Sequence, residues 1–357
     1  MSDEQQPISD EAVVLPRGHA RRQRRARRWP IAAAVLGLIA LAGVGWYELQ
    51  VHPLSSSSKG WTTIEVHAGE GMSAVSGSLR DAGVISSPLA MRIYTTIHGA
   101  PALRAGSYAF HAGSGLPTVK ATLDAPPNAH RFDLPAGFTL AEVAKRIRTF
   151  EPRAFVQSFK HAYETVSVHP TVAPTATTLE GKVAPGIYEV LPGETAGQLL
   201  TEMVQRFDAM ARSVGMTSST TVEGHDVLQV IDIASIVQKE GYYTFNMPKV
   251  SRTIYNRLAK NMPLQMDSTV LYSLGQDGGP VTAATLKIDT PYNTYLHGGL
   301  PPTPIATPSR EALAAAMHPP AGPWLYFVVV DKNGTEAFSA TYAEQLKNQA
   351  LARERGL

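Results

Sequence analysis

The chain has 357 residues, of which 44% are hydrophobic and 17% charged, enough for a membrane anchor and two globular domains. It contains no cysteine, which excludes disulfide bonds, zinc–thiolate sites, iron–sulfur clusters and cysteine nucleophiles. The net charge of +2 arises from arginines near the N-terminus, and the rest of the chain is close to neutral, which argues against nucleic-acid binding.

Residues 1–30 are predicted to form an arginine-rich cytoplasmic tail, and residues 31–47 a transmembrane helix. The second segment carries no charged residue and lies at the short end of the ~17–25 residues that cross a bilayer. Trp29 on one side and Trp46 on the other flank it as interfacial aromatic residues do. The positive-inside rule places the N-terminus in the cytoplasm and the main body outside the cytoplasmic (inner) membrane, in the periplasmic or extracytoplasmic space.

A cleaved signal peptide is the alternative, since Ala40-Leu-Ala42 resembles a cleavage site. The leader before the apolar segment is long for a signal peptide, which favours a retained, single-pass anchor. The arginine run is explained by topology alone and requires no nucleic-acid partner.

Residues 48–60, with four consecutive serines, are predicted to be a flexible linker. A small subdomain follows at 61–127, with the order strand, helix, helix, strand. Its expected elements are a strand at 62–66, a helix marked by Met72, Val75 and Leu79, a helix that begins at Ser87-Pro88 and buries Leu89, Ile93 and Ile97, and a strand at 105–110. This order resembles a LysM domain, a small module that often binds cell-wall glycan; a passive spacer is the alternative.

A partial echo of this subdomain occurs further along the chain. Ile64-Glu-Val-His-Ala-Gly69 is matched by Phe132-Asp-Leu-Pro-Ala-Gly137, and a helical stretch follows each. Two copies of half a motif are too few for a solenoid. Pro126-Pro127-Asn128 lies between the copies and is the predicted domain boundary.

Residues 128–345 are predicted to form a larger domain and residues 346–357 a C-terminal tail, so that the fold class is α+β. The expected elements are helices at 140–149, 196–214 and 226–240, a helix marked by Val250, Ile254 and Leu258, a loop at 166–178, and a hairpin of strands at 324–330 and 335–339.

The helix at 226–240 ends in the carboxylate of Glu240 and is stopped by Gly241, with Asp226 as its N-cap. Its apolar residues cover most of its circumference, so it is predicted to be buried on most sides. The helix dipole and an apolar surround both disfavour the ionised form of a carboxyl group at this end. Both effects keep Glu240 protonated, as a general acid requires near neutral pH. The alternative is a surface glutamate at a frayed helix end.

Seven motifs, in order along the chain, resemble those of the YceG-like (MltG) family of endolytic murein transglycosylases, from about residue 64 to residue 342. They are Leu179-Glu-Gly181 with Pro185 and Tyr188; Ala234-Ser-Ile-Val-Gln-Lys-Glu240; Tyr255-Asn-Arg-Leu258; Leu264-Gln-Met-Asp267 with Thr269-Val270; Pro291-Tyr-Asn-Thr-Tyr295; Gly299-Leu-Pro-Pro302 with Pro304-Ile-Ala306; and Tyr326-Phe-Val328. The resemblance implies a cytoplasmic tail, one membrane helix, a LysM-like subdomain and a YceG-like catalytic domain.

The resemblance also implies that Glu240 is the catalytic acid. The residues that it implies around the substrate are Gln265, Asp267, Thr269, Tyr292, Asn293 and Tyr295. Each has a structural alternative: Asp267 can cap a helix that begins at Ser268, Asn293 can fix a turn, and Tyr292 can belong to the core.

The implied function is cleavage of the MurNAc–GlcNAc bond in nascent peptidoglycan strands, with 1,6-anhydroMurNAc ends, which terminates strand elongation. No metal and no cofactor is expected, because the 11 histidines are scattered. Peptidoglycan synthases are candidate partners. A non-catalytic, membrane-anchored peptidoglycan-binding scaffold is the alternative function.

The chain departs from the family pattern at three places. Asn246-Met247 stands where a Glu-Arg pair is common, Ser268 stands where a proline is common, and Lys182-Val183-Ala184 is an unusual run.

Overall fold

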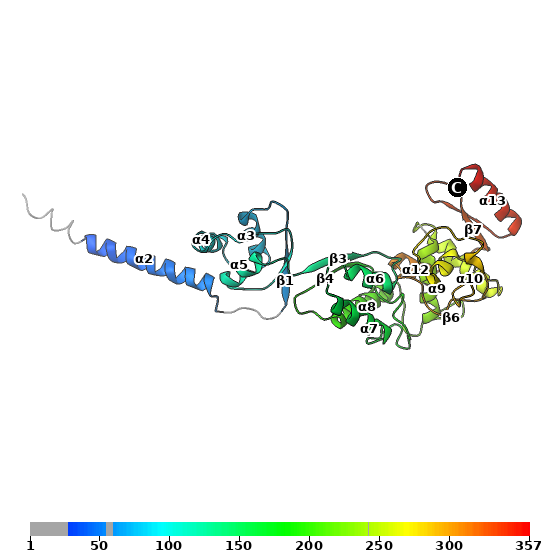
Figure 1. Ribbon diagram of the computed structural model, residues 1–357, viewed down its shortest axis with the longest axis horizontal. Helices are drawn as coiled ribbons and strands as arrows, with labels where there is room; N and C mark the ends of the chain where they lie inside the picture. Colours follow the sequence, from blue (N-terminus) through cyan, green and yellow to red (C-terminus); the bar gives the residue numbers. More distant parts are fainter. Residues whose placement is uncertain (1–27, 55–59, 242) are drawn as a thin grey trace, which may run out of the picture. The chain divides into compact units, whose positions relative to one another are not determined.

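The computed structural model describes residues 28–54, 60–241 and 243–357. These residues divide into two units, Met1–Asn128 and Ala129–Leu357, each with helices and strands (Figure 1), so the predicted α+β class is confirmed. Every sheet in the described ranges is a two-stranded antiparallel ribbon. Most of the predicted arginine-rich tail and the serines of the linker lie outside the described residues.

The first unit begins with helix α2 (Arg28–Val51), of which Trp29–Val51 is long and apolar enough to cross a membrane. The helix is longer at both ends than the predicted span of 31–47, so the predicted linker begins within it. Its large apolar side chains are exposed along most of its length, as expected of a surface that would face lipid.

The remainder of the first unit is a β-α-α-β-α module. It consists of β1 (Trp61–Val66), α3 (Met72–Asp81), α4 (Pro88–His98), β2 (Gly106–His111) and α5 (Leu116–Asp124). Strands β1 and β2 pair, and their inward side chains pack on all three helices in one apolar core.

The helix α4 buries a different face from the predicted one. Ser87 caps it as expected and accepts a hydrogen bond from the Ala90 N–H. However, Leu89, Ile93 and Ile97 are exposed, and Ala90, Met91 and Tyr94 are buried instead. The sequence of α4 carries two apolar stripes. The stripe that is buried contains the small residue Ala90, which allows the helix to approach the sheet closely, so close packing rather than hydrophobicity decides which stripe faces the core.

The second unit begins with the same module. It consists of β3 (His130–Leu134), α6 (Leu140–Ile147), α7 (Arg153–Glu164), β4 (Gly186–Val190) and α8 (Ala196–Ser213). Strands β3 and β4 pair and pack on the three helices in a second apolar core.

The two modules agree in strand register. In each, the last residue of the first strand faces a glycine with positive φ that opens the second strand, and the residue two positions earlier faces a buried tyrosine. These pairs are Val66–Gly106 and Ile64–Tyr108 in one module, and Leu134–Gly186 and Phe132–Tyr188 in the other. Each tyrosine hydroxyl donates to the carbonyl four residues before it. The partial sequence echo is therefore a complete structural repeat.

The modules differ most between their second helix and second strand. The second module has a longer loop here, residues 165–185, which includes the predicted loop at 166–178. Its Val172, Ala173 and Ala176 are buried in the core that surrounds α9 (Val227–Glu240). The loop therefore joins the second module to the rest of the second unit.

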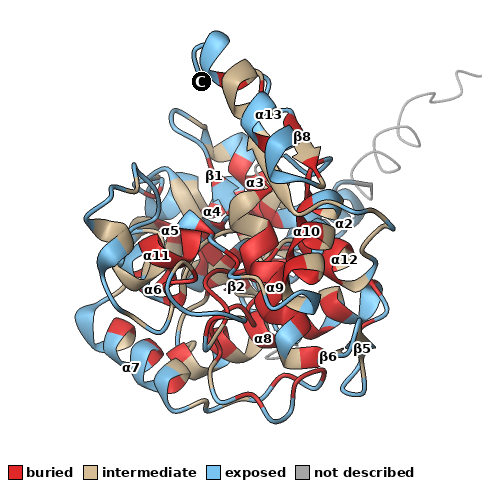
Figure 2. Ribbon diagram, turned by 90° about the vertical axis from the view of Figure 1, so that its right-hand side faces the viewer, coloured by how far each residue is buried: buried red, intermediate tan, exposed pale blue. Residues whose placement is uncertain are grey.

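Helix α9 lies at the centre of this core and is buried along most of its length (Figure 2). It packs against α10 (Met247–Ala259), α11 (Asp267–Ser273) and α12 (Arg310–Met317). The short hairpin of β5 (Thr221–Val222) and β6 (His225–Asp226) leads into it.

The chain ends with the hairpin of β7 (Tyr326–Val329) and β8 (Glu336–Ser339), followed by α13 (Tyr342–Glu354). Helix α13 runs through residue 345, where the predicted catalytic domain ends. The 3-10 helix η1 (Thr285–Lys287) lies between α11 and α12 in the sequence.

Candidate functional site

Glu240 is the last residue of α9, as predicted. The N-terminus of α9 is fixed by a capping box, in which Asp226 accepts from the Gln229 N–H and Gln229 accepts from the Asp226 N–H. The helix stops at Gly241 without a left-handed conformation. A Cβ atom at Gly241 would lie 2.8 Å from Met247 Cγ and 3.0 Å from the Val237 carbonyl oxygen, so any other residue here would require the start of α10 to shift.

The side chain of Glu240 is half-buried and lines a cavity of about 190 Å³. Of the predicted substrate residues, Gln265, Asp267 and Tyr295 line the same cavity. The carboxyl group is therefore neither in bulk solvent nor sealed in the core.

Ser268 is the direct partner of the Glu240 carboxyl group. Its hydroxyl donates to Oε1 at 2.6 Å and its backbone N–H donates to the same atom at 3.3 Å. Burial raises the pKa of Glu240, the Ser268 hydrogen bonds oppose this rise, and the charge of Asp267 adds to it. The net direction is upward, which keeps more of the carboxyl protonated at neutral pH.

Asp267, Tyr295 and Gln265 form the wall of the cavity. The Tyr295 hydroxyl donates to Asp267 Oδ1 at 2.5 Å. Asp267 is the first residue of α11 and Met266 is the N-cap, so Asp267 does not cap this helix. Gln265 has a φ of +53°, a conformation that is uncommon outside glycine and clusters at functional sites.

Arg257 also lines the cavity; it belongs to the motif Tyr255-Asn-Arg-Leu258, but the motif alone indicates no role for this arginine. Its guanidinium group donates to the carbonyl oxygens of Leu325 and Leu264, each at 2.7 Å, and lies over the Tyr326 ring. It ties β7 and the segment before α11 to α10.

Glu336 is a second buried carboxyl group close to Glu240, and nothing in its sequence surroundings beyond its place in a strand indicates this position. It faces Val329 across the hairpin, so strand alternation puts it on the same sheet face as Phe338 and Phe327, which lines the Glu240 cavity. Its Oε2 is buried without a hydrogen-bond partner among the described residues. Burial and the charge of Glu240 raise the pKa of Glu336 to about 8. The raised pKa favours the neutral form of Glu336, which limits the negative charge beside Glu240.

Thr269 and Asn293 do not line the cavity, although the family resemblance implies substrate contacts for both. Both are completely buried. The Thr269 hydroxyl donates to the Met266 carbonyl, and Asn293 Nδ2 donates to the carbonyls of Leu286 and Ile288. All of their polar groups are used in holding the loops of the wall, which is the structural alternative for Asn293.

Tyr292 lines a different hollow, of about 500 Å³. This hollow is bordered by Tyr272 and Ser273, at the C-terminal end of α11. Its ring packs against Tyr272 with centroids 4.9 Å apart, and its hydroxyl is 2.8 Å from Thr303 Oγ1. Glu180 also lines this hollow.

The sequence model of the YceG-like family matches residues 64–351. The chain belongs to the YceG-like family. It is 28% identical over 314 residues to the endolytic murein transglycosylase of Bacillus subtilis (strain 168), covering 83% of this chain and 86% of the relative. It is 25% identical over 350 residues to the endolytic murein transglycosylase of Streptococcus pneumoniae (strain R6), covering 88% of this chain but only 63% of that relative. A crystal structure of a YceG-like protein from Listeria monocytogenes matches 81% of this chain and 99% of its own, with 30% identity and a TM-score of 0.49.

The YceG-like motif Leu179-Glu-Gly181 has a structural explanation here. Gly181 has a φ of +71°, and a Cβ atom there would lie 2.4 Å from Pro304 Cβ. Glu180 accepts hydrogen bonds from the Leu140 N–H at the start of α6. The motif therefore joins the second module to the segment that runs beside α9.

Lys182, which departs from the YceG-like pattern, is buried in the same region. Its exposed fraction is 2%, and its ammonium group donates to the Glu180 carbonyl at 3.2 Å. Burial lowers the pKa of Lys182 to about 8, and the nearby Asp232 and Glu180 oppose this shift. Burial raises the pKa of Glu180 and of Asp232 to about 7 each. Lys182 is thus the cation that compensates two buried carboxyl groups.

Proposed function

We propose that this protein is a membrane-anchored endolytic lytic transglycosylase. It would cleave the MurNAc–GlcNAc bond of nascent peptidoglycan strands, leave 1,6-anhydroMurNAc ends and so terminate strand elongation. Membership of the YceG-like family and two relatives named endolytic murein transglycosylase support the substrate class. The observation that carries the proposal is Glu240, half-buried, with a raised pKa and open to a cavity with polar walls.

In the proposed reaction Glu240 donates its proton to the glycosidic oxygen, and the GlcNAc residue leaves with a 4-hydroxyl group. The acetamido group of MurNAc can stabilise the positive charge that develops on the anomeric carbon. The 6-hydroxyl oxygen of the same MurNAc then bonds to this carbon, and its proton passes to the Glu240 carboxylate. No water is consumed, and the acid is regenerated.

Cyclisation is favoured because the 6-hydroxyl belongs to the same sugar and has a large effective concentration. Asp267 and Tyr295 would lie beside the sugar ring, since both line the cavity with Glu240. Asp267 is a second carboxylate in this cavity, so it is the residue that could instead direct a water molecule to the anomeric carbon, as in ordinary glycosidases.

Product masses test the proposal. We expect the purified chain, in detergent, to convert uncross-linked glycan strands into internal fragments with 1,6-anhydroMurNAc ends. Each fragment should be lighter than the corresponding hydrolysis product by one water molecule, about 18 Da. New reducing ends would show hydrolysis in place of cyclisation, and release of single disaccharides from strand ends would contradict endolytic cutting. Binding without any cleavage would favour the scaffold function.

Ser268→Ala is expected to move the alkaline limb of the pH–activity profile to higher pH. The substitution removes the 2.6 Å hydrogen bond that favours the ionised form of Glu240, so the pKa of Glu240 rises further. Activity requires the protonated acid, and it is therefore retained to higher pH. The measurement is kcat/KM against pH. Ser273→Ala, which removes a hydroxyl of the same helix that donates to Val270, is the control. An unchanged or acid-shifted limb would contradict the assigned role of Ser268.

A further inference from the structure

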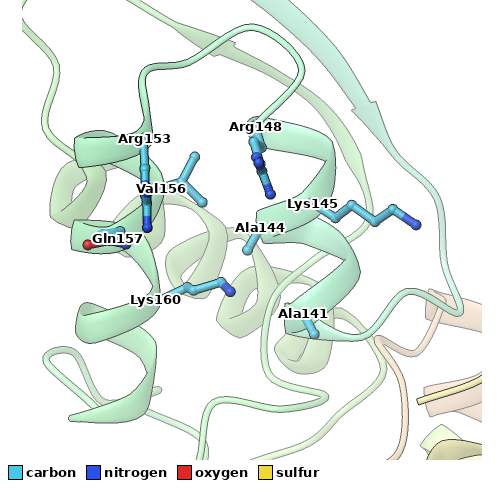
Figure 3. Close-up of a pocket in the computed structure, with 8 residues that line it drawn as sticks. All are labelled: Ala141, Ala144, Lys145, Arg148, Arg153, Val156, Gln157 and Lys160. Atoms are coloured by element: carbon cyan, nitrogen blue, oxygen red, sulfur yellow. The ribbon is translucent and has the colours of Figure 1, made fainter.

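A groove of about 510 Å³ lies between α6 and α7, and none of its residues takes part in the proposed reaction (Figure 3). Four cationic side chains line it: Lys145, Arg148, Arg153 and Lys160. No carboxylate is part of the lining, and none of the four forms an ion pair within the described parts of the chain. Such a surface has a positive field that attracts anions.

The side chains of the groove come from both helices. In Figure 3, Arg148 from α6 and Lys160 from α7 extend into the space between the helices, whereas Lys145 points away from α7. Arg153 lies along α7 at the same space. Ala144 and Val156 are buried and form an apolar floor. An anion that enters would meet cations on two sides.

The repeat within the chain shows that the fold does not require this charge. The sequences of α3 and α4 of the first module can be aligned with those of α6 and α7 by matching their buried positions, for example Met91 with Val156. At the four cationic positions the first module has Gly77, Arg80, Pro88 and Thr95. Arg80 is already paired with Asp81 at 2.7 Å. Arg92 stands at the position of the lining residue Gln157, so the first module has two arginines at the equivalent positions, and the cluster of four cations is specific to the second module.

The groove is linked to the candidate active site by a second hollow and by helix α11. Ala141, at the start of α6, lines both the groove and the hollow that contains Tyr292. That hollow is bounded by Tyr272 of α11, and the same helix begins at Asp267 in the Glu240 cavity. All three hollows lie within the second unit: the groove shares Ala141 with the Tyr292 hollow, and α11 borders both that hollow and the Glu240 cavity.

We propose that the groove binds the carboxylates of the peptide branches carried by the glycan strand that is cut at Glu240. This proposal rests on the proposed function. The hydroxyl and acetamido groups of the sugars are neutral, so they give no reason for a cluster of unpaired cations. The peptide branches carry carboxylates at regular intervals along the strand, and the planar fork of an arginine binds a carboxylate in two places.

The test is binding of soluble glycan strands to the full-length chain in neutral detergent, with Glu240→Gln in every protein so that no strand is cut. Two ligands are compared: uncross-linked strands with their peptides, and the same strands after an amidase has removed the peptides, which leaves one lactyl carboxylate close to each MurNAc ring in place of the more distant peptide carboxylates. We expect the parent to bind the peptide-bearing strands roughly 3- to 30-fold more tightly, as two exposed ion pairs provide. The substitutions Arg148→Gln and Lys160→Gln together should abolish this difference.

Arg146→Gln is the matched control, since Arg146 is an exposed arginine of α6 that does not line the groove. It should bind both ligands as the parent does. Equal binding of both ligands by the parent, or a double variant that still prefers the peptide-bearing strands, would overturn the proposal. So would a double variant that loses affinity for short-chain phosphatidylglycerol but not for the strands, because the occupant would then be a phospholipid headgroup. Since no readout requires cleavage, these outcomes are independent of the product analysis that tests the proposed function.

Discussion

Glu240→Gln is expected to lower the rate of glycan cleavage by about 10²–10⁴-fold, the usual contribution of a general acid. The amide has the shape of the acid but cannot donate its proton to the glycosidic oxygen or later accept one from the 6-hydroxyl group. It can still accept the hydrogen bonds that Ser268 donates to this position. We therefore expect kcat to fall while strand binding changes little, and initial rates with undecorated nascent glycan would measure this.

The chain offers a matched control in Glu164. It is also the last residue of a helix, α7, but it is exposed. Glu164→Gln should cleave at the rate of the unchanged protein. If the Glu240→Gln variant also cleaves at a near-normal rate, Glu240 is not the general acid. The proposed enzymatic function would then have no supporting observation in this cavity.

Lys182→Met is expected to lower the free energy of unfolding by about 3–5 kcal/mol, the usual effect of removing one partner of a buried charged group. Methionine matches the length of the lysine stem, so the loss would come from charge rather than from a cavity. Without Lys182, the buried carboxyl groups of Glu180 and Asp232 lose the nearby cation that favours their ionised forms. Urea denaturation of both proteins measures the difference.

The pH dependence of this loss provides its control. The pKa values of Glu180 and Asp232, about 7 in the folded protein, are raised above those of the unfolded chain. Groups with a raised pKa stabilise the fold at low pH, and this stability is lost as the pH rises towards 7. Removal of Lys182 raises both values further, so the destabilisation should be larger at pH 8 than at pH 5. Adding Asp232→Asn should restore part of the stability at pH 8. A loss that is equal at both pH values would indicate a packing defect instead.

The position of Glu240 could be predicted because its determinants are local. The cap at Asp226, the helical spacing of apolar residues and the stop at Gly241 all lie within one short segment, and the structure has the helix with these ends. The cavity neighbours Gln265, Asp267 and Tyr295 follow from motifs of the family that the chain shares.

The rest depends on contacts between distant segments, which local patterns do not encode. Thr269 and Asn293 are as polar as their neighbours, and only the packing of their loops decides that they point inward. Glu336 is brought near Glu240 by the hairpin β7–β8, which lies far along the chain. The second half of the repeat could not be predicted from the sequence. Tyr108 and Tyr188 occupy equivalent positions in their strand pairs, but the residues on either side of them differ.

The loop at 165–185 has a consequence for how a strand would be cut. Its buried residues Val172, Ala173 and Ala176 share one core with α9, while α7, whose buried side chains belong to the neighbouring core, leads directly into this loop. A peptide branch bound in the groove beside α7 would therefore lie at a constant distance from Glu240. The cut would then fall a fixed number of sugars away from the branch that is bound.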